Sequence, residues 1–368
     1  MPIHGPNQLV EDVIQKGLCV GCGACVGACP YFVTYRAKTA MLFPCTRETG
    51  RCFAHCPKVE ADWDALSQAA YGTPYQGEAL GPVRRVVAAR AKGIFANFQG
   101  GGTVSALLIQ AVESGLAGAA VVTGSENGLP APRLAKSRED ILSAAGSKYG
   151  AAPTLSQVNR AIAEGERRLA VVATPCQALA LAKMARNPLD REDFVPPAEV
   201  VVGLFCTWSL DARSLADLVA RECGEGDACM DLPPPPAQIL SLEANGKRVE
   251  VPLDEVRPLV PQGCSLCPDM TSEWADVSVG EKEGQKGWNT LIVRTEKGEK
   301  LVRAAVDAGL LEIADYPADS LKHLSGAAMG KKKRAFSKAA ESGMVNTEAP
   351  GRACLRVAPE TLDKIVNG

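Results

Sequence analysis

Four cysteines near the N-terminus have the spacing of an iron-sulfur ligand run. Cys19, Cys22, Cys25 and Cys29 form the pattern C-x2-C-x2-C-x3-C, and Pro30 follows directly. In such a run the first three thiolates bind one 4Fe-4S cluster and the fourth reaches a second cluster. A structural zinc site is the alternative, but four cysteines within eleven residues that end in Cys-Pro match iron-sulfur ligation better. The run therefore predicts a 4Fe-4S cluster.

Three further cysteines, Cys45, Cys52 and Cys56, form an incomplete second run. They keep the final C-x3-C-P of a bacterial ferredoxin but replace two short spacings by one long one, so one ligand is missing. With ligands exchanged between the two runs, we expect a first set, Cys19, Cys22, Cys25 and Cys56, to hold one 4Fe-4S cluster. A second set, Cys29, Cys45 and Cys52, is left for a 3Fe-4S cluster, a 4Fe-4S cluster with a non-cysteine ligand, or no cluster.

Four more cysteines are dispersed through the rest of the chain. Cys176 and Cys206 each follow a short apolar run of the kind that forms a buried strand. In an open α/β sheet, ligands collect beyond the carboxyl ends of strands, so these two thiols are expected to converge. Cys264 and Cys267 form a CxxC pair, which alone suits zinc, redox or cluster sites equally. Together these four cysteines, the third set, are the number that another 4Fe-4S cluster needs.

The elements that must position these cysteines alternate between strands and helices. Strands are predicted over Val86 to Ala89, Ala117 to Val122, Leu169 to Ala173 and Val200 to Phe205, and helices over Thr103 to Ser114 and Gln177 to Arg186. The pair Asn245-Gly246 predicts a hairpin turn. We therefore expect a mixed α/β body preceded by a small bacterial-ferredoxin-like α+β domain. Residues 317 to 368 lack strong periodicity and are expected to form a loosely packed tail, with the basic run Lys331 to Arg334 in solvent.

Composition narrows the class of protein. The chain has 368 residues, 46% of them hydrophobic, which is enough to bury a sizeable core. A formal charge of -2 gives no electrostatic reason to expect a nucleic-acid partner. No apolar stretch reaches the ~20 residues of a membrane span, and Glu11 and Asp12 lie where a signal peptide would be apolar. We therefore expect a cytoplasmic protein whose cysteines bind metal rather than form disulfides.

From about Phe98 to Leu311 the chain resembles the beta-subunit family of coenzyme F420 hydrogenases and dehydrogenases. The matching stretches are 99–104 (QGGGTV), 145–149 (AGSKY), 174–177 (TPCQ), 205–206 (FC), 264–269 (CSLCPD), 275–280 (ADVSVG) and 287–295 (GWNTLIVRT). Together with the cysteine runs, the resemblance implies a ferredoxin-like domain at 1–65, N-terminal-like and C-terminal-like family domains at 84–165 and 166–316, and the tail at 317–368.

The resemblance also implies that the third set ligates a 4Fe-4S cluster beside a bound FAD. The residues expected near the flavin are Gly100, Gly101, Gly102, Thr103, Ser147, Lys148 and Tyr149. A glycine triplet ahead of a helix permits close backbone approach and presents helix N–H groups to a pyrophosphate, with an ordinary tight turn as the alternative. Lys148 would place a positive charge near the flavin N1 and stabilise the reduced, anionic ring, and a surface lysine is the alternative.

These residues together lead us to expect an iron-sulfur flavoprotein oxidoreductase with two or three 4Fe-4S clusters and FAD. A flavin is needed because clusters carry single electrons, whereas coenzyme F420 or NAD(P)H exchanges hydride. The expected partners are ferredoxin or other redox subunits, within a hetero-oligomeric hydrogenase, formate dehydrogenase or reductase complex. One alternative is a self-contained ferredoxin-dependent flavin reductase of an organic substrate. Another, of a different class, is a zinc-stabilised interaction module without redox function.

Overall fold

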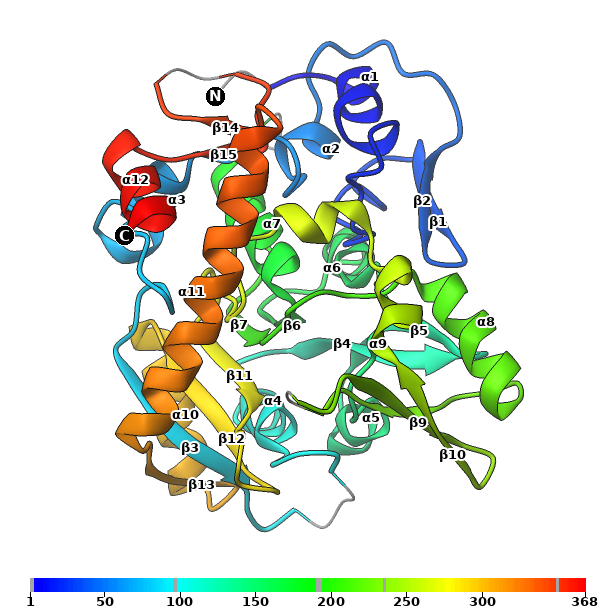
Figure 1. Ribbon diagram of the computed structural model, residues 1–368, viewed down its shortest axis with the longest axis vertical. Helices are drawn as coiled ribbons and strands as arrows, with labels where there is room; N and C mark the ends of the chain where they lie inside the picture. The colour runs from blue at the N-terminus through cyan, green and yellow to red at the C-terminus, as the bar shows by residue number, and fades with distance from the viewer. Residues whose placement is uncertain (1–2, 95–97, 190–193, 234–235, 349–350) are drawn as a thin grey trace.

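The body of the protein is built on one eight-stranded mixed sheet. A computed structural model describes residues 3–94, 98–189, 194–233, 236–348 and 351–368. The strand order is β13-β3-β12-β11-β7-β6-β4-β5 (Figure 1). The strands are β3 (Arg85–Ala91), β4 (Ala119–Glu126), β5 (Leu129–Ala135), β6 (Leu169–Ala173), β7 (Val200–Leu204), β11 (Val277–Glu281), β12 (Asn289–Val293) and β13 (Leu311–Asp315). Strands β11, β7, β6 and β4 are parallel, whereas β12, β13 and β5 run the opposite way.

Helices cover both faces of this sheet, because successive residues of a strand point to opposite faces. Val121 and Val171 pack in the same core as α6 and α7, while Val122 and Val202 pack in a second core with α4, α5 and α10. These helices are α4 (Thr103–Glu113), α5 (Arg138–Ser143), α6 (Thr154–Ala163), α7 (Pro175–Arg186) and α10 (Glu296–Asp307). Strands buried on both faces explain the near-continuous Val, Ala and Leu runs of the sequence. The predicted mixed α/β body is confirmed.

The N-terminal region forms the expected small α+β unit. Its elements are α1 (Pro6–Leu9), the π-helix η1 (Val10–Ile14), the hairpin β1 (Phe32–Tyr35) and β2 (Lys38–Met41), α2 (Arg51–Ala54) and α3 (Trp63–Tyr71). It does not have a core of its own, since Leu9 and Phe53 belong to the same buried cluster as Leu155 of α6 and Phe336. The backbone N–H of Leu155 also donates to the carbonyl of Cys22 at 3.1 Å. The proposed boundary at residue 65 therefore does not coincide with a break in the core.

A smaller three-stranded sheet lies beside the body. It consists of β8 (Cys229–Asp231), β9 (Ile239–Ala244) and β10 (Lys247–Pro252), and it packs with α8 (Ala212–Cys223), α9 (Leu253–Val256) and the 3-10 helix η2 (Arg257–Leu259). The β9–β10 turn is the predicted Asn245-Gly246 pair. Both residues have positive φ, 53° and 74°, as a two-residue hairpin turn of this kind requires.

The expectation of a loosely packed tail at 317–368 is wrong. Helix α11 (Ala318–Glu341) runs along the body, and β14 (Val345–Asn346), β15 (Leu355–Arg356) and α12 (Pro359–Asn367) follow it (Figure 1). The first half of the basic run is not solvated either, because Lys331 and Lys332 are 6% and 0% exposed, whereas Lys333 is half-buried and Arg334 is exposed. The apolar stripe of α11 is largely alanine, so its periodicity is weak in the sequence. Among the described helices, none is long and apolar enough to cross a membrane.

Candidate iron-sulfur and flavin sites

The first set of cysteines lines one hollow beside α1 and η1. All four members line it: Cys19, Cys22, Cys25 and Cys56. The loop that carries the first three turns at Gly21 and Gly23, which have φ of 66° and 84°. A Cβ at Gly23 would lie 2.5 Å from the carbonyl oxygen of Pro153, so the loop packs directly on the start of α6. Two segments far apart in sequence thus offer their thiols to the same space.

The four thiols around this hollow give the first set the ligand number of a 4Fe-4S cluster. Nowhere in the described ranges do three Cys, His, Asp or Glu side chains gather closely enough to bind one metal ion. A zinc ion would hold its ligands around one point, at about 2.3 Å for sulfur. In a 4Fe-4S cluster each thiolate binds a different iron atom, so the four sulfurs stand farther apart. The residues present therefore fit a cluster, with the four thiols around a hollow.

The second set lies next to the first. Burial, with smaller contributions from the nearby thiols of Cys29 and Cys45, raises the pKa of Cys52 to about 12. Burial likewise raises the pKa of Cys25 well above its usual range, and Cys52 is one of the neighbouring thiols that add to this shift. The structure thus brings Cys29, Cys45 and Cys52 together beside the first set. What this second set holds stays a prediction.

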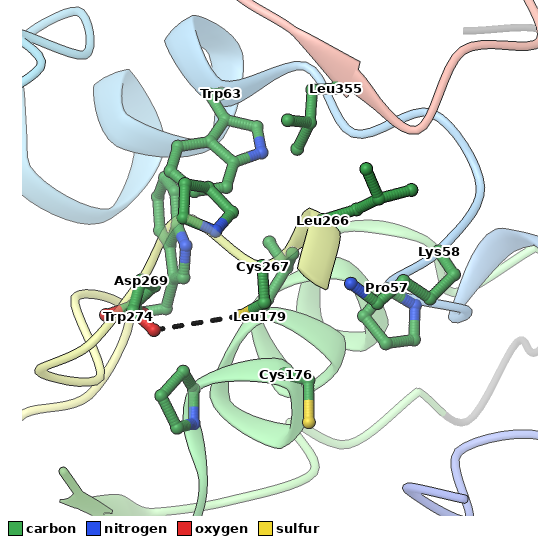
Figure 2. Close-up of a pocket in the computed structure, with 12 residues that line it drawn as sticks. Pro57, Lys58, Trp63, Cys176, Leu179, Leu266, Cys267, Asp269, Trp274 and Leu355 are labelled. Carbon is green, nitrogen blue, oxygen red and sulfur yellow. Dashed lines mark hydrogen bonds between the residues drawn. The ribbon is translucent and has the colours of Figure 1, made fainter. Parts of the chain in front are cut away.

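The third set gathers at the carboxyl edge of the parallel strands. Cys176 follows β6 at the start of α7, and Cys206 follows β7, as predicted for strand ends. Cys264 and Cys267 lie within and directly after the 3-10 helix η3 (Gln262–Leu266). The thiols of Cys264, Cys176 and Cys267 each raise the pKa of Cys206, although burial is the larger cause. Cys176 and Cys267 also line one pocket with Trp63 and Trp274 (Figure 2).

The three sets form a continuous series. Cys52 of the second set is close enough to Cys25 of the first to raise its pKa, as described above. Burial raises the pKa of Cys22 well above its usual range, and the largest contribution from another thiol is that of Cys176 in the third set. The first set therefore lies between the other two.

Three buried lysines lie among these cysteines. The ammonium of Lys183 donates to the carbonyl of Cys56 at 2.6 Å, and that of Lys331 donates to the carbonyl of Cys206 at 2.7 Å. Lys58 lines both the hollow of the first set and the pocket of the third. Only Lys58 stands next to a predicted ligand in sequence, two residues after Cys56. Lys183 lies seven residues after Cys176 in α7, and Lys331 belongs to the basic run that was expected in solvent, so neither was predicted beside a cluster.

The two segments expected near the flavin are neighbours. The backbone N–H of Ser147 donates to the side-chain oxygen of Gln99 at 2.9 Å. The ammonium of Lys148 donates to the carbonyls of Ala144, Ala145 and Gly146 at 2.9–3.1 Å. Burial lowers the pKa of Lys148. Its charge therefore lies at the C-terminal end of α5, in the loop that meets the glycine segment.

Packing within the protein explains two of the three glycines. A Cβ at Gly101 would lie 2.5 Å from the side-chain oxygen of Asn289. Gly102 has a φ of 71°, and a Cβ there would lie 2.5 Å from the ring of Phe98. One polar group at the start of α4 remains without a partner in the described chain, the buried hydroxyl of Thr103. Tyr149 packs against the core beneath the three-stranded sheet, and burial raises its pKa to about 12.

Models of known protein families match three parts of the chain. The model for the C terminus of the coenzyme F420 hydrogenase/dehydrogenase beta subunit matches residues 166–319. The model for the N-terminal part of the same family matches residues 86–159, and that of a 4Fe-4S binding domain matches residues 12–33. The last match confirms the iron-sulfur character of the N-terminal cysteine run.

Curated relatives and one solved structure agree with these matches. The chain is 32% identical to the beta subunit of coenzyme F420 hydrogenase from Methanococcus voltae, over 63% of this chain and 85% of the relative. It is 28% identical to a subunit of the F(420)H(2) dehydrogenase of Methanosarcina mazei, over 85% of this chain and 89% of the relative. It is 29% identical to coenzyme F420-dependent sulfite reductase of Methanocaldococcus jannaschii, over 80% of this chain but 47% of that longer protein. A chain of the F420-reducing NiFe hydrogenase complex from Methanosarcina barkeri superposes with a TM-score of 0.64 and 27% identity, covering 72% of this chain and 95% of that one.

Proposed function

Because this chain belongs to the coenzyme F420 hydrogenase/dehydrogenase beta-subunit family and is an oxidoreductase, we propose that it carries electrons between 4Fe-4S clusters and a bound FAD, which exchanges hydride with coenzyme F420. The flavin supplies the conversion between single electrons and hydride. The continuity of the three cysteine sets carries this proposal, since it provides neighbouring ligand sets from the N-terminal region to the edge of the sheet.

The proposed ligands of the clusters are the first and third sets, with the second set as ligands of a further cluster. The protein around the first and third sets contributes positive charge and backbone N–H groups. The N–H of Lys58, for example, donates to the Cys56 sulfur at 3.4 Å. Such donors stabilise the added electron of a reduced cluster, because reduction increases the negative charge on the sulfurs.

The position of the glycine loop supports a flavin at the same edge of the sheet. Strand β3 runs parallel to β7, because both β3 and β11 are antiparallel to β12 and β11 is parallel to β7. The loop that follows β3 therefore leaves the sheet at the edge where Cys206 follows β7. Three strand spacings separate β3 from β7 in the sheet, which is about 14 Å. The proposed flavin residues are Gly100, Gly101, Gly102, Thr103, Ser147, Lys148 and Tyr149.

The segment between Cys29 and Cys45 supports a protein partner at the N-terminal end. Tyr35 and Phe43 in this segment are 72% and 62% exposed, which is unusual for large aromatic side chains. Together with the relatives that are named as subunits, this favours docking of another redox subunit or ferredoxin beside the second set.

Spectra and steady-state assays of the anaerobically purified protein test the proposed function. We expect a brown protein with flavin absorption that reduces or oxidises coenzyme F420, with weaker or no turnover of NADH and NADPH. Turnover of an organic acceptor with reduced ferredoxin, without F420 activity, would favour the self-contained reductase instead. A colourless protein that contains zinc and no iron or flavin would contradict both readings.

The Lys148→Ala variant is expected to lower the two-electron reduction potential of the flavin. Removal of a nearby cation destabilises the reduced, anionic ring more than the oxidised one. Since the side chain is only partly buried, solvent screening reduces the interaction to about 1 kcal/mol or less. For a two-electron couple this corresponds to about 20 mV, which a redox titration with Lys148→Arg as control resolves. A potential that is unchanged or higher would place Lys148 away from the flavin.

A further inference from the structure

Lys58 lies between the first and third cysteine sets. It lines the hollow that all four cysteines of the first set surround, and it also lines the pocket that contains Cys176 and Cys267 (Figure 2). The side chain is 6% exposed. The thiols whose charges bear most on its ammonium are those of Cys267, Cys354, Cys176 and Cys264. Lys58 therefore borders the hollow of the first set, whereas the cluster thiols that act most on its charge belong to the third.

The ammonium of Lys58 has none of the partners that buried lysines normally have. Within the described ranges, no carboxylate lies within ion-pair distance of its Nζ and no oxygen accepts a hydrogen bond from it. Asp269 lines the same pocket, but its two carboxylate oxygens accept the backbone N–H groups of Thr271 at 2.9 Å and Glu273 at 2.8 Å. A largely buried ammonium without a carboxylate partner is unfavourable unless another negative charge lies nearby, and the third-set thiols, or a cluster bound to them, supply that charge.

The other buried lysines provide the comparison. Lys332 is paired with the carboxylate of Glu273 at 2.7 Å. Lys183 and Lys331 donate to backbone carbonyls, those of Cys56 and Cys206, and thus lie on the outer sides of the first and third sets respectively. The thiols whose charges act most on Lys331 belong to the third set. Those that act most on Lys183 belong to the first set, apart from Cys354, which is in none of the sets. The thiols that act most on Lys58 likewise belong to the third set, apart from Cys354, but Lys58 also lines the hollow of the first set.

We propose that Lys58 is a fixed positive charge shared by the clusters of the first and third sets, and that it raises the reduction potential of both. This inference rests on the proposed function, because it requires that both sets hold clusters. A cluster with four thiolates is anionic and gains one further negative charge on reduction. A cation held nearby in the protein interior favours the more negative state. Because Lys58 lies between the two sets, it stabilises the electron on either side of the transfer between them.

Redox titration followed by EPR on the full-length, cluster-loaded protein tests this role. We expect Lys58→Met to make the potentials of both clusters more negative, that of the third-set cluster by at least a tenfold change in the reduction equilibrium constant, which is about 59 mV for one electron, and that of the first-set cluster by a smaller factor. Lys58→Arg keeps the charge and should change neither equilibrium constant tenfold. Lys331→Met serves as the matched control, since it should shift the potential of the third-set cluster and leave the first-set cluster unchanged.

The variants distinguish the effect of the Lys58 charge from the effect of the side chain's shape. Unchanged potentials in Lys58→Met with wild-type iron content would overturn the proposal, and so would an equal shift in Lys58→Arg. If Lys58→Met loses a cluster, Lys58→Gln decides as a second neutral variant. Loss of a cluster in both neutral variants but not in Lys58→Arg supports the role of the charge, whereas loss in Lys58→Arg as well contradicts it. A wild-type protein without two clusters would instead contradict the proposed function on which this inference rests.

Discussion

The Cys264→Ser variant is expected to lose the iron of one cluster, about four iron atoms per chain, and to keep the N-terminal cluster. Cys264 belongs to the third set, whose four thiols converge from two strand ends and η3. A serine hydroxyl is a poor ligand for iron in such a cluster, because it stays protonated where a thiol is deprotonated on binding. Iron analysis and EPR of wild type and variant measure the change.

Cys229→Ser is the matched control for this prediction. Cys229 is exposed on β8 and lies outside all three sets, so its replacement should change neither the iron content nor the EPR signals. Since serine and cysteine differ by one atom, both variants should fold. Unchanged iron per chain in Cys264→Ser would remove Cys264 from the ligands and return its CxxC pair to an unassigned role.

The arrangement of the third set shows what could be predicted from the sequence. Cys176 and Cys206 each follow a strand, and parallel strands end at the same edge of a sheet. The strand runs before them are apolar throughout, which identifies them as strands buried on both faces. The position of these two thiols therefore follows from local pattern and topology alone. The adjacency of Cys22 and Cys176 does not, because it depends on how the N-terminal loop packs on α6.

The C-terminal segment shows why the rest could not be predicted. The sequence predicts that the lysines of α11 lie in solvent, because a run of charged residues is normally exposed. Their partners are remote in sequence: the carboxylate of Glu273 for Lys332 and the carbonyl of Cys206 for Lys331. The small alanines on the buried side of the helix also give little periodicity. Long-range pairing, rather than any local property, buries this helix.

The glycine loop is an intermediate case. The sequence places three glycines ahead of a helix, and the structure confirms α4 from Thr103 onward. The close packing of Gly101 on Asn289 and of Gly102 on Phe98 requires glycine with no ligand present. The pattern therefore predicted the local geometry, whereas the flavin assignment depends on the family and on the adjacent Ser147–Tyr149 segment.

A fully buried ion pair joins α11 to the body. The ammonium of Lys332 donates to Glu273 at 2.7 Å, to the hydroxyl of Tyr75 at 2.6 Å and to the carbonyl of Glu78 at 2.7 Å. The second carboxylate oxygen of Glu273 accepts the Tyr75 hydroxyl at 3.1 Å. Each of the three N–H groups of the ammonium thus has an acceptor. Both charged side chains are at most 1% exposed. The removal of one partner would leave the other charge buried and uncompensated.

Lys332→Met is therefore expected to reduce the free energy of unfolding by about 3–5 kcal/mol at neutral pH. Burial raises the pKa of Glu273, Asp269 adds to this, and the charges of Lys332 and Arg294 oppose it, so loss of the lysine should raise the pKa further. A carboxyl group whose pKa is higher in the folded state binds more protons there, so stability falls as pH rises through that pKa. The deficit of the variant should accordingly shrink as the pH is lowered from neutral toward the ordinary glutamate pKa of about 4.3.

Chemical denaturation of the variant across this pH range measures the effect, and the Lys332→Met, Glu273→Gln double variant is its control. The double variant removes the stranded carboxylate while the amide can still accept a hydrogen bond from Tyr75, so it should recover most of the lost stability and its deficit should no longer depend on pH. If the double variant were as unstable as Lys332→Met at every pH, the loss would come from packing of the lysine stem rather than from the buried charge. In that case α11 would be held to the body by its apolar stripe, which Ala335, Phe336 and Ala339 form, and the ion pair would contribute little.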